Sequence, residues 1–186
     1  LIAIRTISTR ATATFSVKDF HRMTILTPMT EPEFTTYLAK AIPEFAQDKV
    51  DAGQWSTDEA LALSRSGYAE MLPLGLATPD HFFFTVRNTA TQEDVGMLWF
   101  AVQARAGQRI AYVYDVYIHA EHQRKGHASR AFAALDEEAR QRGLTGVALH
   151  VFGHNTGAQA LYHKLGYATT NINMFKPLAP ATRGST

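Results

Sequence analysis

Three β-forming runs follow one another between residues 81 and 119, and they set the architecture that the rest of the chain must fit. The runs cover 81–87, 95–103 and 110–119, and each is rich in aromatic and β-branched residues. The short polar stretches between them are typical of turns that join neighbouring strands. Three strands connected in this way form an antiparallel meander, so the remaining elements are expected to pack on the faces and edges of that sheet.

The chain before this meander predicts a strand and two helices. Residues 22–28 alternate as a short strand, and Thr30 and Glu33 have the spacing of a capping box at the start of an amphipathic helix. Pro43 is expected to kink or split that helix. A second capping box at 56–59 predicts another helix, which should end before Pro73 and Gly75.

The chain after the meander predicts two further helix–strand pairs. A helix is expected at 128–142 with Gly143 after its end, followed by a strand at 147–152. A helix at 155–165 with Gly166 after its end, and a last strand at 167–176, complete the pattern. The fold class is therefore α/β of the mixed α+β kind, a mixed and mostly antiparallel twisted sheet with helices on both faces, in the order β-α-α-β-β-β-α-β-α-β.

Composition narrows the class of protein. The 186 residues fit one domain, expected at 23–178, with an N-terminal extension at 1–22 and a flexible tail at 179–186. The chain has no cysteine, which excludes disulfides, thiolate metal sites and cysteine nucleophiles. A net charge of +1 gives no general attraction to nucleic acid, and no apolar run approaches the roughly 18 residues of a membrane helix. We expect a cytoplasmic protein, although residues 1–18, which lack acidic residues and are rich in serine and threonine, weakly resemble an organelle-targeting peptide.

A basic loop between the third run and the next helix is the candidate site for chemistry. It holds Gln123, Arg124, Lys125 and Gly126 directly before the predicted helix. The first N–H groups of a helix lack internal acceptors and favour an anion such as a phosphate, and a glycine allows close approach. Neither a P-loop nor a G-x-G-x-x-G fingerprint is present. An ordinary loop-to-helix turn with solvated basic residues is the competing interpretation.

Two motifs together resemble the GNAT superfamily of N-acetyltransferases. The first, Arg/Gln-x-x-Gly-x-Gly/Ala, matches 123–128 as QRKGHA, and the second, Asn-x-x-Ala-x-x-Leu-Tyr-x-Lys-x-Gly-Phe/Tyr, matches 155–167 as NTGAQALYHKLGY. The element order from Met23 to Lys176 also fits this family. Ala120 stands where many members carry proline, and Ala128 replaces the second glycine; neither change removes a needed N–H.

This resemblance implies acetyl-coenzyme A as co-substrate and no metal. The diphosphate is expected on the main-chain amides of the loop, the pantetheine arm along the end of the third run, and a Val116 or Tyr117 N–H against the reacting carbonyl oxygen. The strand at 110–119 is expected to diverge from its neighbour and leave a V-shaped cleft. The residues implied in binding are Val116, Tyr117, Ile118, Gln123, Arg124, Lys125, Gly126, His127, Ala128, Ser129, Asn155 and Tyr162.

The resemblance also implies two catalytic groups. Tyr162 stands where the family places the acid that returns a proton to the leaving thiolate; the alternative is a packed aromatic ring. Asp115, the one carboxylate in the third run, is a candidate base for the amine or else orders a neighbouring hydroxyl or backbone group. Strand alternation places Asp115 with Val113 on one face and Tyr114 on the other, unless a bulge shifts the count.

The acceptor is expected to be a primary amine of a small molecule or a peptide. The two N-terminal helices should form one wall of its site, with candidate residues Phe34, Tyr37, Trp55, Tyr68, Met71 and Glu70, which could equally be helix core. The histidines have no metal-ligand spacing. A catalytically silent acetyl-coenzyme A-binding module is the alternative function, and a nucleic-acid binder is disfavoured. We expect a monomer or a homodimer with no nucleic-acid or membrane partner.

Overall fold

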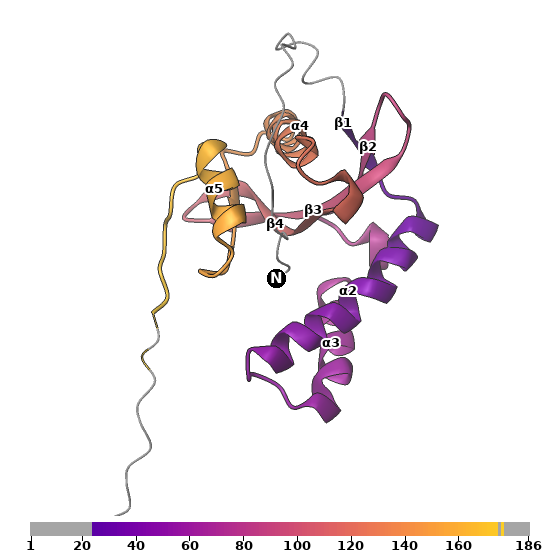
Figure 1. The fold of residues 1–186 in the computed structure, drawn as a ribbon, viewed down its shortest axis with the longest axis vertical. Coiled ribbons are helices and arrows are strands. Elements are labelled where there is room, and N and C mark those ends of the chain that lie inside the picture. The colour runs from indigo at the N-terminus through magenta and orange to yellow at the C-terminus, as the bar shows by residue number, and fades with distance from the viewer. Residues whose placement is uncertain (1–23, 175, 177–186) are drawn as a thin grey trace, which may run out of the picture.

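The described residues form a five-stranded mixed sheet. Figure 1 shows helices on both faces of this sheet. A computed structural model describes residues 24–174 and 176, so the calls on residues 1–22 and 179–186 lie outside the described residues. The elements in chain order are β1 (Thr24–Pro28), α2 (Glu31–Asp51), α3 (Thr57–Met71), the 3-10 helix η1 (Gly75–Ala77), β2 (His81–Asn88), β3 (Asp94–Arg105), β4 (Gln108–Ile118), the 3-10 helix η2 (Ala120–His122), α4 (His127–Gln141), β5 (Val147–Leu149) and α5 (Thr156–Lys164).

The strands lie in the order β1-β2-β3-β4-β5. The first four pair antiparallel, which confirms the predicted meander, and β5 pairs parallel with β4. The β4–β5 pairing covers only three residue pairs and ends at Val113↔Leu149, whereas β4 continues to Ile118. Beyond Val113, β4 therefore has no strand partner on that side.

The sheet separates two apolar cores. One lies under α4 and α5 and includes Phe100, Phe132 and Tyr162. The other lies under α2 and includes Phe34, Tyr37 and Trp99, with Tyr68 of α3 packed against it. Figure 1 shows the α4–α5 pair and the α2–α3 pair on opposite sides of the sheet.

The capping box at Thr30 is confirmed, but Pro43 does not split the helix that it starts. Glu33 accepts from the Thr30 N–H at 2.7 Å, and α2 continues through Pro43 to Asp51. Ala41 and Ala46 on either side of the proline are buried, and the Ser64 hydroxyl of α3 donates to the Ile42 carbonyl at 2.8 Å. Packing against α3 therefore holds the helix together where the proline removes one backbone hydrogen bond.

The second capping box is only partly formed. Helix α3 begins at Thr57, directly after Ser56, as the sequence predicts. The Ser56 side chain donates to the Glu59 carboxylate at 3.0 Å, and makes no hydrogen bond to the first N–H groups of the helix. The sequence therefore predicted the start of α3 correctly, but the reciprocal hydrogen bonds of a capping box do not form there.

The predicted last strand does not form in the described part of its range, residues 167–174 and 176. Strand β5 ends at Leu149, short of the predicted 152, and residues 167–174 pair with no strand. After Tyr167, which packs on the α4–α5 core, the segment meets no neighbouring strand, and Ile172 and Met174 are exposed. β-forming residues make a strand only when a partner edge satisfies their backbone groups.

Within the described ranges, no helix combines the length and the apolar character needed to cross a membrane.

Candidate active site

The junction between β4 and α4 exposes the start of the helix. Two positions of the loop, Arg124 and Gly126, have left-handed backbone with φ of 62° and 82°. Helix α4 begins at His127, and no side chain caps its first N–H groups. These donors, at the positive end of the helix dipole, form the kind of site that binds a phosphate.

Gly126 is required here for two reasons. Its positive φ is strained for any residue with a side chain. A Cβ at this position would also lie 2.7 Å from Nη1 of Arg130, so even a methyl group would collide with the guanidinium. The loop backbone therefore depends on glycine, which agrees with the role that the sequence motif implies.

The loop is braced from both ends. Gln123 Nε2 donates to the Ile118 carbonyl at 3.0 Å, which fastens the loop to the end of β4. Arg130 donates to the Lys125 carbonyl at 2.8 Å and, through Nε, to the Thr24 hydroxyl at 2.8 Å. Gln123 thus uses its amide N–H to position the loop, while the Arg130 side chain is buried behind it.

His127 points into the protein rather than toward an anion. Its Nδ1 lies 2.9 Å from the Thr24 hydroxyl and 3.2 Å from Nη2 of Arg130. A guanidinium only donates, so Nδ1 is an acceptor and the ring is the neutral Nε2–H tautomer. Burial and then the Arg130 charge lower the pKa of His127 to about 4, which agrees with this tautomer. Nδ1 of His127 is therefore engaged inside the protein, and at the helix start this residue offers its backbone N–H.

Asp115 is buried beside this junction on β4. It is 3% exposed, and its Oδ2 accepts from the Tyr37 hydroxyl at 3.0 Å. Its Oδ1 is buried with no hydrogen-bond partner. Burial raises the pKa of Asp115 to about 6, and the Tyr37 hydrogen bond opposes that rise. A carboxylate with this pKa is ionised at neutral pH and takes up a proton readily.

A β-bulge corrects the predicted faces of β4. The β3 register shifts between Trp99, opposite Asp115, and Phe100, opposite Val113, so Tyr114 is the extra residue. Asp115 and Tyr114 therefore both lie on the α2–α3 side, and Val113 lies in the α4–α5 core. Simple alternation predicted that Val113 shares a face with Asp115 and that Tyr114 lies on the other face. Both predictions were wrong.

Several aromatic side chains pack together on the side of the sheet where Asp115 lies. Tyr114 stacks on Trp99 at 4.7 Å between ring centroids, and Tyr68 lies 6.2 Å from Trp99. Burial raises the pKa of Tyr68 to about 12, and its hydrogen bond with Tyr37 acts in the opposite direction.

The predicted acceptor-wall residues divide into core and surface. Phe34 and Tyr37 are buried, Tyr68 is half-buried, and Trp55 packs edge-on against Phe45 at 5.6 Å. Met71 and Glu70 are exposed on α3, where Glu70 accepts from Ser66.

Tyr162 lies on α5, on the other side of the sheet. Its ring packs edge-on against Phe132 at 5.4 Å and is buried. Burial, and then the charge of Asp115, raise the pKa of Tyr162 to about 12, so the phenol is protonated at neutral pH. Asn155 caps α5 by accepting from the Ala158 N–H at 3.2 Å, as predicted. The charge of Asp115 therefore acts on Tyr162 although the two candidate catalytic residues lie on opposite sides of the sheet.

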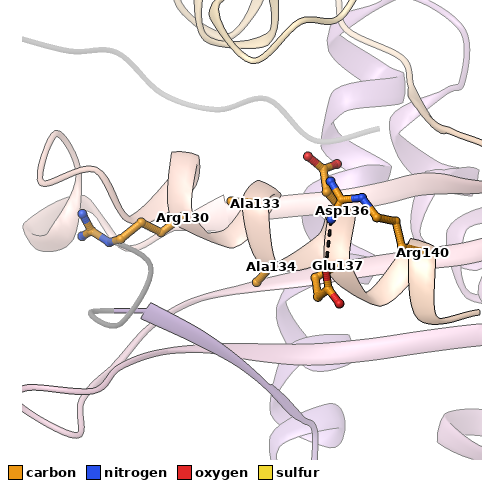
Figure 2. A pocket seen from close by; sticks show the side chains of 6 residues that line it. All are labelled: Arg130, Ala133, Ala134, Asp136, Glu137 and Arg140. Atoms are coloured by element: carbon orange, nitrogen blue, oxygen red, sulfur yellow. Dashed lines mark hydrogen bonds and ion pairs between the residues drawn. The ribbon is translucent and has the colours of Figure 1, made fainter. Parts of the chain in front are cut away.

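A hollow of about 330 Å³ lies elsewhere, along α4. Figure 2 shows its lining, which includes the exposed ion pair of Arg140 with Glu137 at 3.0 Å and contains neither Asp115 nor Tyr162. The part of the chain that the structure describes holds no cluster of three or more His, Cys, Asp or Glu placed to bind a metal ion.

Comparison with known proteins decides the family. The model of the acetyltransferase (GNAT) family matches residues 45–167, which include the whole junction and both motifs. The chain belongs to the GNAT acetyltransferase family. The chain is 38% identical over 157 residues to the uncharacterized N-acetyltransferase YycN of Bacillus subtilis, covering 84% of this chain and 100% of that protein. It is 37% identical to the uncharacterized N-acetyltransferase YdgE of the same organism, covering 82% of this chain and 97% of the relative.

Solved structures agree with the GNAT assignment. The crystal structure of YycN superposes with a TM-score of 0.76 at 36% identity, covering 84% of this chain and 99% of that one. An aminoglycoside 6'-N-acetyltransferase from Acinetobacter baumannii superposes with a TM-score of 0.54 at 17% identity, covering 84% of this chain and 99% of that one, and this likeness shows the fold alone. The predicted fold class and the predicted transferase class are confirmed.

Two contacts of the site lie beyond the sequence-based prediction. Tyr37 was considered only as part of the acceptor wall, yet it is the hydroxyl that donates to Asp115. Arg130 was not among the residues predicted for this site, yet it braces the loop from behind. Tyr37 lies on the apolar stripe of its helix and carries no local signal of such a role. A Cβ added at Gly126 would meet the Arg130 guanidinium, and only the structure supplies this sign that Arg130 lies behind the loop.

Proposed function

We propose that this GNAT chain transfers the acetyl group of acetyl-coenzyme A to a primary amine of a small molecule or a peptide. The amine attacks directly in a complex that contains both substrates. One observation carries the proposal: after the short connection at 119–126, the β4 segment that no longer pairs with β5 leads to the uncapped start of α4 at the left-handed Gly126. An acyl carrier with a diphosphate and an amide-containing arm matches both features.

The residues fit coenzyme A in two places. The main-chain N–H groups of residues 124–129 are proposed to bind the diphosphate, because the left-handed turns and the missing Cβ of Gly126 leave room for it. The backbone of Val116, Tyr117 and Ile118, which has no strand partner toward β5, is proposed to pair with the pantetheine amides as an added strand would.

Asp115 is proposed as the base and Tyr162 as the acid. In the reaction a bond forms between the amine nitrogen and the carbonyl carbon, and the bond from that carbon to sulfur breaks. A Val116 or Tyr117 N–H stabilises the carbonyl oxygen as charge develops on it. Asp115, with its pKa near 6, receives the proton from the amine, and Tyr162, which is protonated at neutral pH, gives a proton to the departing thiolate.

A thiol-release assay tests the proposal. The chain is incubated with acetyl-coenzyme A and, separately, with amino acids, polyamines, aminoglycosides and peptide N-termini. Release of free coenzyme A that depends on one amine class, with an equal amount of acetylated amine by mass spectrometry, is expected. Binding of coenzyme A without amine-dependent release would instead indicate a catalytically silent binding module.

A further inference from the structure

The pairing of β3 with the end of β4 fixes the direction in which the β4 backbone groups point. Gly96 of β3 lies opposite Ile118 of β4. Just beyond this pair, the His119 N–H donates to the Val95 carbonyl at 2.9 Å. In an antiparallel ladder, a hydrogen bond in that position marks a pair that exchanges no hydrogen bonds of its own. The N–H and C=O of Ile118 therefore point away from β3, toward the side where β4 has no strand partner beyond Val113.

A side-chain contact agrees with this direction. The Ile118 carbonyl accepts from Nε2 of Gln123, which belongs to the loop before α4 and not to β3. Backbone direction alternates along a strand, so the N–H and C=O of Tyr117 point toward β3 and those of Val116 point away from it. Of the two N–H groups proposed above for the reacting carbonyl oxygen, only that of Val116 therefore lies on the unpaired side of β4.

Gly96 lies against the peptide group that joins Tyr117 to Ile118. A Cβ added at Gly96 would collide with the Tyr117 carbonyl oxygen and lie 3.0 Å from the Ile118 Cα. Both are backbone atoms, so no side-chain rotation could make room. Gly96 is not among the residues with left-handed backbone, unlike Gly126. The close approach of β3 to β4 is therefore the reason that this position requires glycine.

We propose that Gly96 is a positioning residue for the cofactor, holding the 117–118 peptide so that the Ile118 N–H meets an amide carbonyl of the pantetheine arm. This inference rests on the proposed binding of acetyl-coenzyme A. The Tyr117 carbonyl and the Ile118 N–H belong to one planar group and point in opposite directions. A side chain at position 96 that pushes the carbonyl away from β3 therefore also moves the N–H. Gln123 holds the next carbonyl, so the backbone on both sides of the Ile118 Cα is fixed.

Calorimetric titration of a glycine variant measures the effect on the arm. Coenzyme A and its nucleotide fragment, which has the diphosphate but lacks pantetheine, are titrated into the unmodified chain and into Gly96→Ala. The variant is expected to bind coenzyme A about 10-fold more weakly, as the loss of one hydrogen bond would cause, and to bind the fragment unchanged. The matched control is Gly146→Ala, because nothing lies within 4 Å of the added Cβ and the backbone there is not left-handed.

The two ligands separate positioning from a general structural role. Equal weakening of coenzyme A and the fragment in Gly96→Ala, or coenzyme A affinity equal to that of the control, would overturn the role of Gly96 and leave the proposed function standing. An unmodified chain that binds neither ligand would overturn the proposed function itself, and this inference with it.

Amide hydrogen exchange followed by NMR tests the same contact in the unmodified chain, so it does not depend on the folding of a variant. The Tyr117 N–H, which faces β3, is expected to exchange slowly with and without ligand. The Ile118 N–H is expected to exchange more slowly with coenzyme A than with the nucleotide fragment, because only coenzyme A brings the arm. Equal protection of the Ile118 N–H by the two ligands would overturn the proposal.

Discussion

Asp115 combines burial with charge at the scale of a single residue. Its Oδ2 accepts a hydrogen bond from the Tyr37 hydroxyl, and its Oδ1 is buried with no partner at hydrogen-bond geometry. The pKa of about 6 lies above the ordinary 3.8, so the folded protein binds this proton more tightly than the unfolded chain does. Stability is therefore lost as pH rises from about 4 through about 6, by about 3 kcal/mol in total. A buried ionisable group that lowers the stability of the folded state in this way is typical of a catalytic site.

Asp115→Asn is expected to separate activity from stability. The neutral amide can still accept from Tyr37 but cannot take the proton of the amine, so turnover should fall about 100-fold or more while coenzyme A affinity stays unchanged. The melting temperature of the variant should exceed that of the unmodified protein by a margin that grows as pH rises from 4 to 7. Scanning calorimetry over this pH range measures it, and a variant that is less stable at pH 7 would assign Asp115 a structural role.

Tyr37→Phe is expected to shift the pH dependence of turnover upward. The Tyr37 hydrogen bond holds the pKa of Asp115 down, so its removal should raise the midpoint below which activity is lost. The control is Tyr114→Phe, because the Tyr114 hydroxyl accepts from Gln103 rather than bonding to Asp115. A pH–rate profile of kcat/KM for both variants measures the effect. An unchanged or lowered midpoint in Tyr37→Phe would show that this hydroxyl does not position the base.

Tyr162→Phe tests the proposed acid. Loss of the phenol should lower kcat with little change in coenzyme A affinity, since the ring and its packing remain. Tyr167→Phe is the matched control, because its hydroxyl is buried without a partner in the same aromatic cluster and its removal should not lower stability. Equal kcat values for the two variants in steady-state assays would exclude Tyr162 as the acid.

At the scale of elements, local chemistry was enough to predict most helices and not the details of the strands. The Thr30 capping box and the left-handed Gly143 and Gly166 act within a few residues, so helix ends could be read from the sequence. The bulge at Tyr114 could not, because it depends on how β3 and β4 are paired. Strand propensity after Tyr167 was real, but whether a strand forms depends on a partner that no local pattern specifies.

Gly126→Ala tests the loop before α4. Left-handed backbone in alanine costs about 1–2 kcal/mol, and the new methyl group would also displace Arg130 from its contacts behind the loop. Gly143→Ala is the control after the same helix: its φ is 67°, and nothing lies within 4 Å of the added Cβ. Chemical denaturation should show a larger loss of stability for Gly126→Ala, with coenzyme A affinity lowered only in that variant. Equal losses and unchanged affinity would mean that Arg130 yields without moving the loop.

At the scale of the whole molecule, the site lies where the two cores meet across the sheet. Tyr37 reaches Asp115 from 78 positions away in the sequence, and Arg130 reaches Thr24 from 106 positions away. The two motifs predicted the loop, the cap at Asn155 and the family, because each motif is continuous in the chain. Tyr37, which contacts Asp115, comes from a distant helix, and Arg130, which braces the loop, is held in turn by Thr24 of a distant strand, so these contacts could be found only from the folded structure.

Calorimetric titration tests the central claim that the main chain at 124–129 binds a diphosphate. Coenzyme A and pantetheine, which lacks the diphosphate, are titrated into the unmodified chain, and coenzyme A is titrated into Gly126→Glu, whose side chain adds bulk and negative charge to the loop. The account predicts that pantetheine binds at least about 100-fold more weakly than coenzyme A and that Gly126→Glu shows no binding. Equal affinities for the two ligands, or unchanged binding in Gly126→Glu, would contradict it.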